Sequence, residues 1–315
     1  MSKKRNAGIF AAFSSAVFLG MAPVFGKAAI TMGFSPLAVV ALRTGFAATI
    51  VLAAIAIFYR HYLYIFPVGL IGCILAGTIN GLGSLLYYLA LGRLDASLGQ
   101  LLYSLYPFFV ALWLVLDHQS PSRLTLFRIA LATVAVLLLT GVGDSDVDLI
   151  GVLMMIGGSI LYAMHLPINQ RVLYEVPAPT VTLYTLLAMS AVVVPAYFIF
   201  DRAWPIGDIP WLPVAGLTFV TVFSRIALFL GVKKIGGMQT ALLGLAELLI
   251  AIFLSNILLG ESLSLIQWLG ALGLGASLIL VMYEKPMMPS SSGKTGWLSW
   301  IRPPTLPKDI FGPYE

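Results

Sequence analysis

The chain has 315 residues, of which 60% are hydrophobic and only 10% are charged, and its mean hydropathy is +0.98. This composition excludes the pair of soluble domains that the length would otherwise suggest. In a soluble protein the formal charge of +5 would raise the question of nucleic acid, but here the basic residues lie between apolar runs. Their excess therefore indicates membrane topology, and no nucleic-acid partner is expected.

Ten apolar runs are long enough to cross a hydrocarbon core of ~30 Å as helices, because such a helix needs about 20 residues. In chain order they cover residues 7–31, 36–58, 66–91, 96–116, 124–141, 149–170, 178–200, 211–232, 237–259 and 263–283. Stretches such as Leu131 to Leu139 lack the alternation of a membrane β-strand. The predicted fold class is an all-α integral membrane bundle of ten transmembrane helices.

The two ends of the chain differ in character. The first run follows three basic residues, as in a signal peptide, but it is about 25 residues long and nine more runs follow it, so we expect a retained anchor. Residues 286–315 are rich in Pro, Ser and Gly. This tail is expected to be disordered, or to lie on the membrane through Trp297 and Trp300.

Charge also predicts the orientation. If the amino terminus is cytoplasmic, the inner segments hold thirteen Lys and Arg residues and the outer segments hold three. Because cytoplasmic loops carry the basic excess, both termini are predicted to be cytoplasmic, in the cell (inner) membrane. The acidic loop at residues 143–148 is then external. Cys73, the single cysteine, cannot form an intrachain disulfide, and no metal or cofactor motif is present, so no cofactor is expected.

The two halves of the chain resemble each other weakly. At a shift of 144, Pro23 falls on Pro167 and Lys27 falls on Arg171; at a shift of 141, Arg93 falls on Lys234 and residues 105–107 fall on 246–248. Matched prolines and basic residues are harder to obtain by chance than matched leucines. We therefore predict two five-helix repeats, residues 1–143 and 144–285, followed by the cytoplasmic tail. Since five is odd, the repeats are inverted, as in many secondary transporters.

Several segments also carry a family resemblance, which extends from residue 8 to about residue 283. They are residues 20–27, 35–36, 41–43, 88–92, 105–107, 245–247, 259–261 and 267–270. Together they resemble EamA-type members of the drug/metabolite transporter superfamily. Two positions depart from that pattern: Leu248 follows Glu247 where the family has proline, and Ser120 replaces an acidic residue. The resemblance implies ten helices and the movement of small metabolites without ATP; it does not imply a particular substrate.

Ionisable side chains at membrane depth are costly and tend to be functional. Glu247 lies about ten residues into its helix and is the only carboxylate far from a helix end, and Arg225 lies at a similar depth. They are expected to form a buried ion pair, a site for a proton or substrate, or a pair that opens during turnover and so does both. For Arg43 we expect a structural role, at the interface or on helix carbonyls.

The other candidate substrate-binding residues are neutral. His165 lies close to Pro167, where a kink is predicted, and Pro23 is the matched kink in the first repeat. Asn80 is polar at membrane depth, with bonding between helices as the alternative. Tyr103 and Tyr106 are the aromatic residues best placed by depth to line a cavity, although tyrosines also form interfacial belts.

These features predict a secondary transporter that moves a small organic metabolite, such as an amino acid, a nucleoside or an amphipathic cation, by alternating access, with proton coupling as one option. Its partners would be the substrate and the lipid bilayer, and the chain would be a monomer or a homodimer. An intramembrane enzyme is disfavoured because no second catalytic group stands near the first. A scaffold would not need buried Glu, Arg and His, whereas a passive channel stays open as an alternative.

Overall fold

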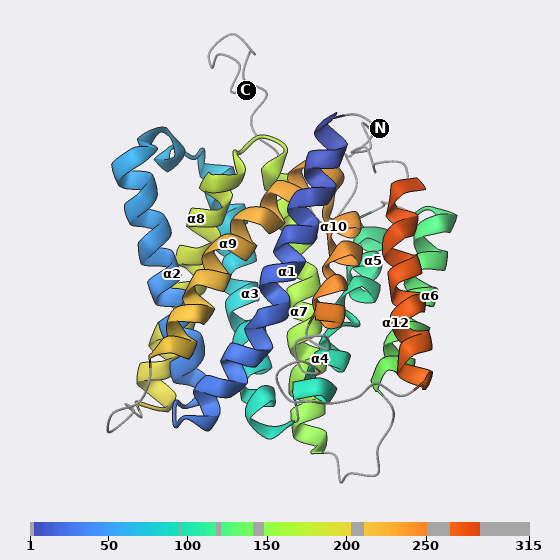
Figure 1. Ribbon diagram of the computed structural model, residues 1–315. Helices are drawn as coiled ribbons and strands as arrows, with labels where there is room; N and C mark the ends of the chain where they lie inside the picture. Colours follow the sequence, from blue (N-terminus) through green and yellow to red (C-terminus); the bar gives the residue numbers. More distant parts are fainter. Residues whose placement is uncertain are drawn as a thin grey trace.

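The computed structural model describes residues 3–94, 96–117, 121–140, 148–202, 211–250 and 265–283. All regular secondary structure in these ranges is helical, and Figure 1 shows the helices packed side by side in one bundle. The prediction of an all-α fold is confirmed.

The helices in the first half of the chain are α1 (Lys3–Thr31), α2 (Pro36–Phe58), the 3₁₀ helix η1 (Arg60–Leu63), α3 (Pro67–Arg93), α4 (Ala96–Tyr103), α5 (Tyr106–Leu116) and α6 (Arg123–Thr140). Those in the second half are α7 (Leu149–Leu173), α8 (Ala178–Phe200), α9 (Leu212–Ile235), α10 (Gly237–Gly244), α12 (Leu265–Ile279) and the 3₁₀ helix η2 (Leu280–Tyr283). Side-chain caps and prolines determine where some of these helices begin, and α2 is an example. The Ser35 hydroxyl accepts from the Ala38 amide at 3.1 Å, and proline opens α2, where its missing N–H costs nothing.

Six of the described helices, α1, α2, α3, α7, α8 and α9, are long and apolar enough to cross a membrane. Shorter apolar helices cover Tyr106–Leu116, Gly237–Ile250 and Trp268–Ser277. Parts of three predicted runs lie outside the described residues: 141, 251–259 and 263–264. So do most of the acidic loop at 143–148 and the whole tail at 286–315.

Two predicted runs are broken rather than continuous. The run at 96–116 is divided by a turn at Ser104 and Leu105, and α10 ends before a turn at Leu245. The Ser104 hydroxyl donates to the Gln100 carbonyl at 2.6 Å, so a carbonyl at the end of α4 is satisfied. By contrast, α1, α7 and α8 continue past their internal prolines. Proline therefore does not interrupt these three helices, and the kinks at Pro23 and Pro167 stay predictions.

The packing brings distant segments together. Helix α1 packs on α9, α3 packs on α7 and α8, α2 packs on α8 and α9, and α6 packs on α12. The contact of α3 with α7 is close because it is made by glycines. A Cβ added at Gly158 would lie 3.0 Å from the Gly83 carbonyl oxygen, and one added at Gly83 would lie 3.2 Å from the Gly158 carbonyl oxygen. Small residues here permit backbone contact between the two helices.

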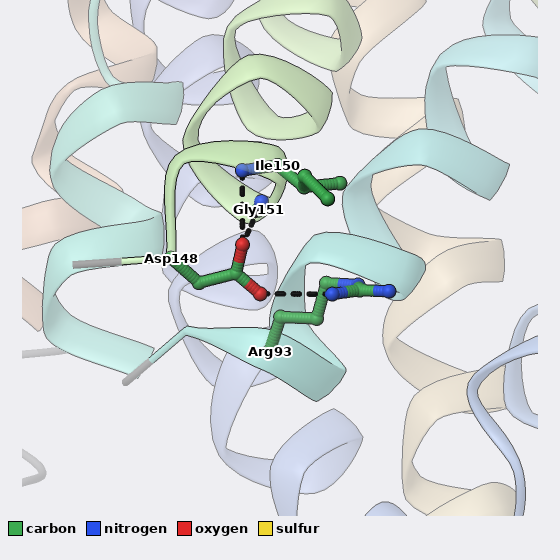
Figure 2. A network of polar contacts seen from close by, with 4 residues as sticks. All are labelled: Arg93, Asp148, Ile150 and Gly151. Atoms are coloured by element: carbon green, nitrogen blue, oxygen red, sulfur yellow. Dashed lines mark hydrogen bonds and ion pairs between the residues drawn. The ribbon is translucent and has the colours of Figure 1, made fainter. Parts of the chain in front are cut away.

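Both ends of α7 are tied to neighbouring helices. Asp148 caps its first turn by accepting from the Ile150 and Gly151 amides at 2.9 and 3.2 Å, and it pairs with Arg93 of α3 at 2.9 Å, as Figure 2 shows. At the other end, Arg171 pairs at 2.5 Å with Asp117, which follows α5.

A third cation, Arg128, corrects the assignment of charges to loops. It is one of the thirteen Lys and Arg residues that the orientation argument counted in the inner segments, but its side chain is fully buried. It donates to the Ser277 carbonyl at 2.9 Å and to the Gln239 amide oxygen at 2.5 Å. Arg128 therefore joins α6 to α12 and α10 inside the bundle. Its position five residues into α6 leaves it within the helix rather than in the loop.

Candidate functional site

A cavity of about 50 Å³ lies where the long helices meet the broken ones. In this conformation it has room for a few water molecules, at about 10–15 Å³ each, so a metabolite would enter only after the helices move apart. Its lining comes from α1, α2, α3, α4, α7, α9 and the segment after α10. The lining residues are Leu19, Ala22, Pro23, Arg43, Ser84, Tyr87, Tyr88, Gln100, Tyr103, Tyr162, Arg225 and Glu247.

The carboxylate at this cavity belongs to Glu247, which is only 4% exposed. The turn at Leu245 ends α10, so Glu247 stands two residues beyond the break. Gln100 of α4 donates its amide hydrogen to the Glu247 carboxylate at 3.1 Å, and the Tyr87 hydroxyl donates to the Gln100 amide oxygen at 3.4 Å. A chain of hydrogen bonds thus links α3, α4 and the acidic residue.

One of the two arginines, Arg225 of α9, is held by neutral groups. With its amide oxygen turned toward the guanidinium, Asn80 accepts from both terminal nitrogens of Arg225, each at 2.9 Å. A terminal nitrogen of Arg225 also lies 3.5 Å from His165 Nε2, and the other ring nitrogen of His165 contacts the Tyr162 carbonyl. Asn80 and His165 therefore position Arg225 from behind, outside the cavity lining.

The second arginine, Arg43 of α2, is 7% exposed and also lines the cavity. Its guanidinium donates to the Thr221 hydroxyl at 3.2 Å and to the Ser84 hydroxyl at 3.5 Å, and it lies 4.8 Å from the Tyr88 ring centroid. The expectation that Arg43 reaches the interface or caps carbonyls was wrong. Because α2 packs on α9, this face of α2 is turned toward the interior.

Aromatic rings form much of the remaining wall. Tyr103 is the centre of this group, with ring centroids 4.8 Å from Tyr87 and 5.2 Å from Tyr162. Tyr106 packs behind them, 5.0 Å from Tyr162, and its hydroxyl donates to the Ala241 carbonyl of α10 at 2.8 Å. Tyr106 thus bridges the two broken helices instead of facing the cavity.

The structure places the six predicted substrate-binding residues in two layers. Three of them, Glu247, Arg225 and Tyr103, line the cavity. The others, His165, Asn80 and Tyr106, lie one layer behind and contact the lining residues.

The expected direct pair between Arg225 and Glu247 is not formed among the described residues, where each binds other partners. Their similar depth put them at one level of the bundle. Depth alone does not say which way a helix face is turned.

Sequence reasoning gave two lining residues too little weight. Gln100 was not among the predicted substrate-binding residues, although it lies three residues before Tyr103 and therefore on the same helix face. Arg43 carried the stronger signal, a charge at membrane depth. In the part of the chain that the structure describes, no group of three or more His, Cys, Asp or Glu residues could hold a metal ion.

A bundle of apolar helices around a small, charged central cavity is the architecture of a membrane transporter. The EamA-like transporter family matches residues 6–141 and again residues 149–283, and the chain belongs to that family. It is an integral membrane protein, and the resemblance seen in the sequence is confirmed.

Two individual proteins are also similar to this chain. "Uncharacterized transporter YcbK" of Bacillus subtilis (strain 168) is 25% identical over 216 residues, which are 65% of this chain and 69% of that protein. A solved structure described only as "Crystal structure of protein" superposes with a TM-score of 0.72 over 89% of this chain and 97% of that one. At 16% identity, this second likeness concerns the fold alone.

Proposed function

We propose that the chain is a secondary active transporter that moves a small organic metabolite across the cytoplasmic membrane by alternating access. One observation carries the proposal: the buried Glu247, Arg43 and Arg225 meet at a cavity beside two broken helices. Discontinuous helices at the site are a recurrent feature of secondary transporters, because their free ends can bind a substrate or an ion. The breaks face each other, since Leu105 and Leu245 line one small gap.

We further propose that the bundle has ten crossings in two inverted repeats, residues 1–143 and 144–285. The family matches twice, from residue 6 and from residue 149. The turns at Ser104 and Leu245 coincide at the shift of 141 found in the sequence. The packing is also the same when each helix is replaced by its counterpart in the other repeat. Helix α1 then becomes α7 and α9 becomes α3, so the contact of α1 with α9 corresponds to that of α7 with α3; the contact of α6 with α12 corresponds to itself. These three observations support the duplication independently.

In this proposal Glu247 binds a proton at one stage of the transport cycle. A carboxylate removed from water is costly unless it is protonated or paired, and its partner here is the neutral amide of Gln100. A cationic substrate that replaced the proton would give exchange, whereas an anionic substrate that needed it would give cotransport. Both termini would be cytoplasmic.

The decisive experiment is uptake into liposomes that contain the purified protein, screened with amino acids, nucleosides, organic acids and organic cations. A transporter should show saturable uptake without ATP, driven by an imposed pH gradient. Uptake that rises linearly with concentration would instead indicate a channel, and no uptake of any compound in either orientation would contradict the proposal.

A further inference from the structure

The two cavity arginines have no acidic partner among the described residues. Arg43 binds the hydroxyls of Thr221 and Ser84, and Arg225 binds Asn80 and His165. The described ion pairs involve other arginines, at the two ends of α7. In addition, the Nε of Arg43 is buried and has no hydrogen-bond partner in the part of the chain that the structure describes. Two buried cations that are held only by neutral groups are expensive unless something else brings a negative charge.

The two guanidinium groups belong to one region of the wall. Arg43 reaches the Thr221 hydroxyl on α9, and Thr221 lies four residues before Arg225, one turn away on the same face. Both arginines are at least 93% buried, with exposures of 7% and 5%. Each therefore presents fixed donors to the cavity from a position that bulk water does not reach.

Resting on the proposed transport function, we propose that the substrate carries a carboxylate group and that Arg43 and Arg225 bind it. The planar guanidinium fork matches a carboxylate with two parallel N–H donors, which a lysine ammonium cannot do. The rings of Tyr88, Tyr103 and Tyr162 supply flat apolar surface beside the two arginines. The substrate class is thus a small organic carboxylate with an apolar, preferably aromatic, body.

The position of Glu247 adds a consequence for coupling. The charged groups of the cavity lining are Arg43, Arg225 and Glu247, and its tyrosine hydroxyls belong to Tyr87, Tyr88, Tyr103 and Tyr162. A carboxylate in the cavity would repel an ionised Glu247 and favour its protonated form. A simple acid would therefore enter together with a proton. An amino acid would bring an ammonium group that takes the proton's place.

Four compounds with one skeleton separate these cases: hydrocinnamate (anion), phenylalanine (zwitterion), phenethylamine (cation) and phenethyl alcohol (neutral). Binding to the purified full chain at pH 7 is measured by its thermal shift and intrinsic fluorescence. We expect at least one of the two carboxylates to bind more tightly than both the amine and the alcohol, by about tenfold or more, because a hydrogen bond to a charged group contributes about that much. Binding of hydrocinnamate points to a simple acid, and binding of phenylalanine alone points to an amino acid.

Two variants test the assignment of residues. Arg43→Gln and Arg225→Gln should each weaken carboxylate binding by about ten- to a hundredfold. Arg93→Gln is the matched control, because Arg93 is exposed outside the cavity, and it should bind as the unchanged chain does. Arg225→Lys keeps the charge without the fork and should retain part of the affinity. It replaces Arg225→Gln if the glutamine variant does not fold.

The outcomes separate this inference from the transport function. Equal binding of the amine or alcohol, unchanged carboxylate binding in both Gln variants, or binding of none of the four compounds overturns the inference. If proteoliposomes accumulate phenethylamine but not hydrocinnamate or phenylalanine, the transport function stands and the carboxylate site falls. If a carboxylate binds through the two arginines but no compound is transported, the site stands and the transport function falls.

Discussion

Gln100 and Glu247 lie in opposite halves of the chain, yet the Gln100 amide nitrogen donates to the Glu247 carboxylate at 3.1 Å. Each residue adjoins a break: Gln100 lies one turn before the turn at Ser104, and Glu247 lies just after the turn at Leu245. This hydrogen bond therefore joins the two broken helices at the cavity. Any movement that separates the helices must break it.

The first prediction concerns Glu247 as the proton site. Glu247→Gln keeps the shape of the side chain but cannot bind and release a proton, so accumulation driven by a pH gradient should be lost. Slow exchange of substrate for substrate should persist in proteoliposomes. Glu175→Gln, at an exposed position after α7, is the control and should accumulate normally. Accumulation against a gradient by the Glu247→Gln protein would make Glu247 structural.

The second prediction concerns the bridge between the breaks. Tyr106→Phe leaves the Ala241 carbonyl without its donor and should cost about 1–3 kcal/mol. Gly244→Ala should also destabilise the protein, because the added Cβ would overlap the Tyr106 hydroxyl. In the Tyr106→Phe background that Cβ meets only the ring, 3.3 Å away, so the second change should cost less. Thermal unfolding in detergent measures the stability lost in each single variant and in the double variant. Additive losses would rule out the contact of Tyr106 with α10.

The third prediction concerns what holds Arg225. Asn80→Ala and Arg225→Ala remove two ends of one interaction, so their effects on thermal stability should be strongly non-additive, with a coupling of about 0.5–3 kcal/mol. The same cycle for Arg225→Ala and Glu247→Ala should give a smaller coupling, because these residues share no hydrogen bond. The reverse order would show that a direct ion pair forms after all.

The fourth prediction concerns the Asp148 cap. The hydrogen bond from Arg93, with those from the Gly151 and Ile150 amides, holds the pKa of Asp148 below its ordinary value of 3.8. The stabilisation is therefore complete above pH ~4 and is lost as the pH falls through the lowered pKa. The melting temperature of Asp148→Ala should lie below that of the unchanged chain by a constant amount from pH 7 to pH 5, and the difference should shrink below pH ~4.

A matched variant separates the parts of this interaction. Asp148→Asn keeps an oxygen for the two amides but loses the ion pair, so it should fall between the Ala variant and the unchanged chain. A difference that stays constant down to pH 3 would show that the charge of Asp148 plays no part.

The fifth prediction concerns topology. Met32 follows α1 and Tyr64 follows η1, and both side chains are exposed, so cysteines there are accessible. In a Cys73→Ala background, an impermeant thiol reagent should label the Met32→Cys protein from outside and the Tyr64→Cys protein from inside. Labelling of both from one face would exclude a crossing between them and the inverted repeats with it.

The sequence predicted the long helices well, because apolar length and proline starts are local signals. The predicted run at 36–58 and α2 coincide, as do the run at 178–200 and α8. The break at Leu245 was less accessible. Pro195 lies inside a continuous helix, while the turn at Leu245 has no nearby proline. Such a break is stabilised by a distant residue, Tyr106, and a contact between distant segments leaves no local pattern.

The sequence predicted the depth of the site residues in the membrane but not the neighbours that their side chains face. Glu247 and Arg225 stood out because charge inside a membrane is costly, and both line the cavity. They do not pair directly in this structure, where each binds other partners, since two residues at one level can face different neighbours. His165 was predicted beside the substrate but lies behind Arg225, and only the packing of α7 against α9 decides between these positions.

The contact of Gly83 with Gly158 has a mechanical consequence. Where α3 crosses α7, the two glycines bring backbone atoms of one helix close to backbone atoms of the other. At such a crossing one helix can rotate relative to the other without changes of side-chain rotamer at the contact. Ser84 follows one glycine directly, and Tyr162 stands one turn beyond the other. A small rotation of α3 relative to α7 at this contact would therefore displace two walls of the cavity at once.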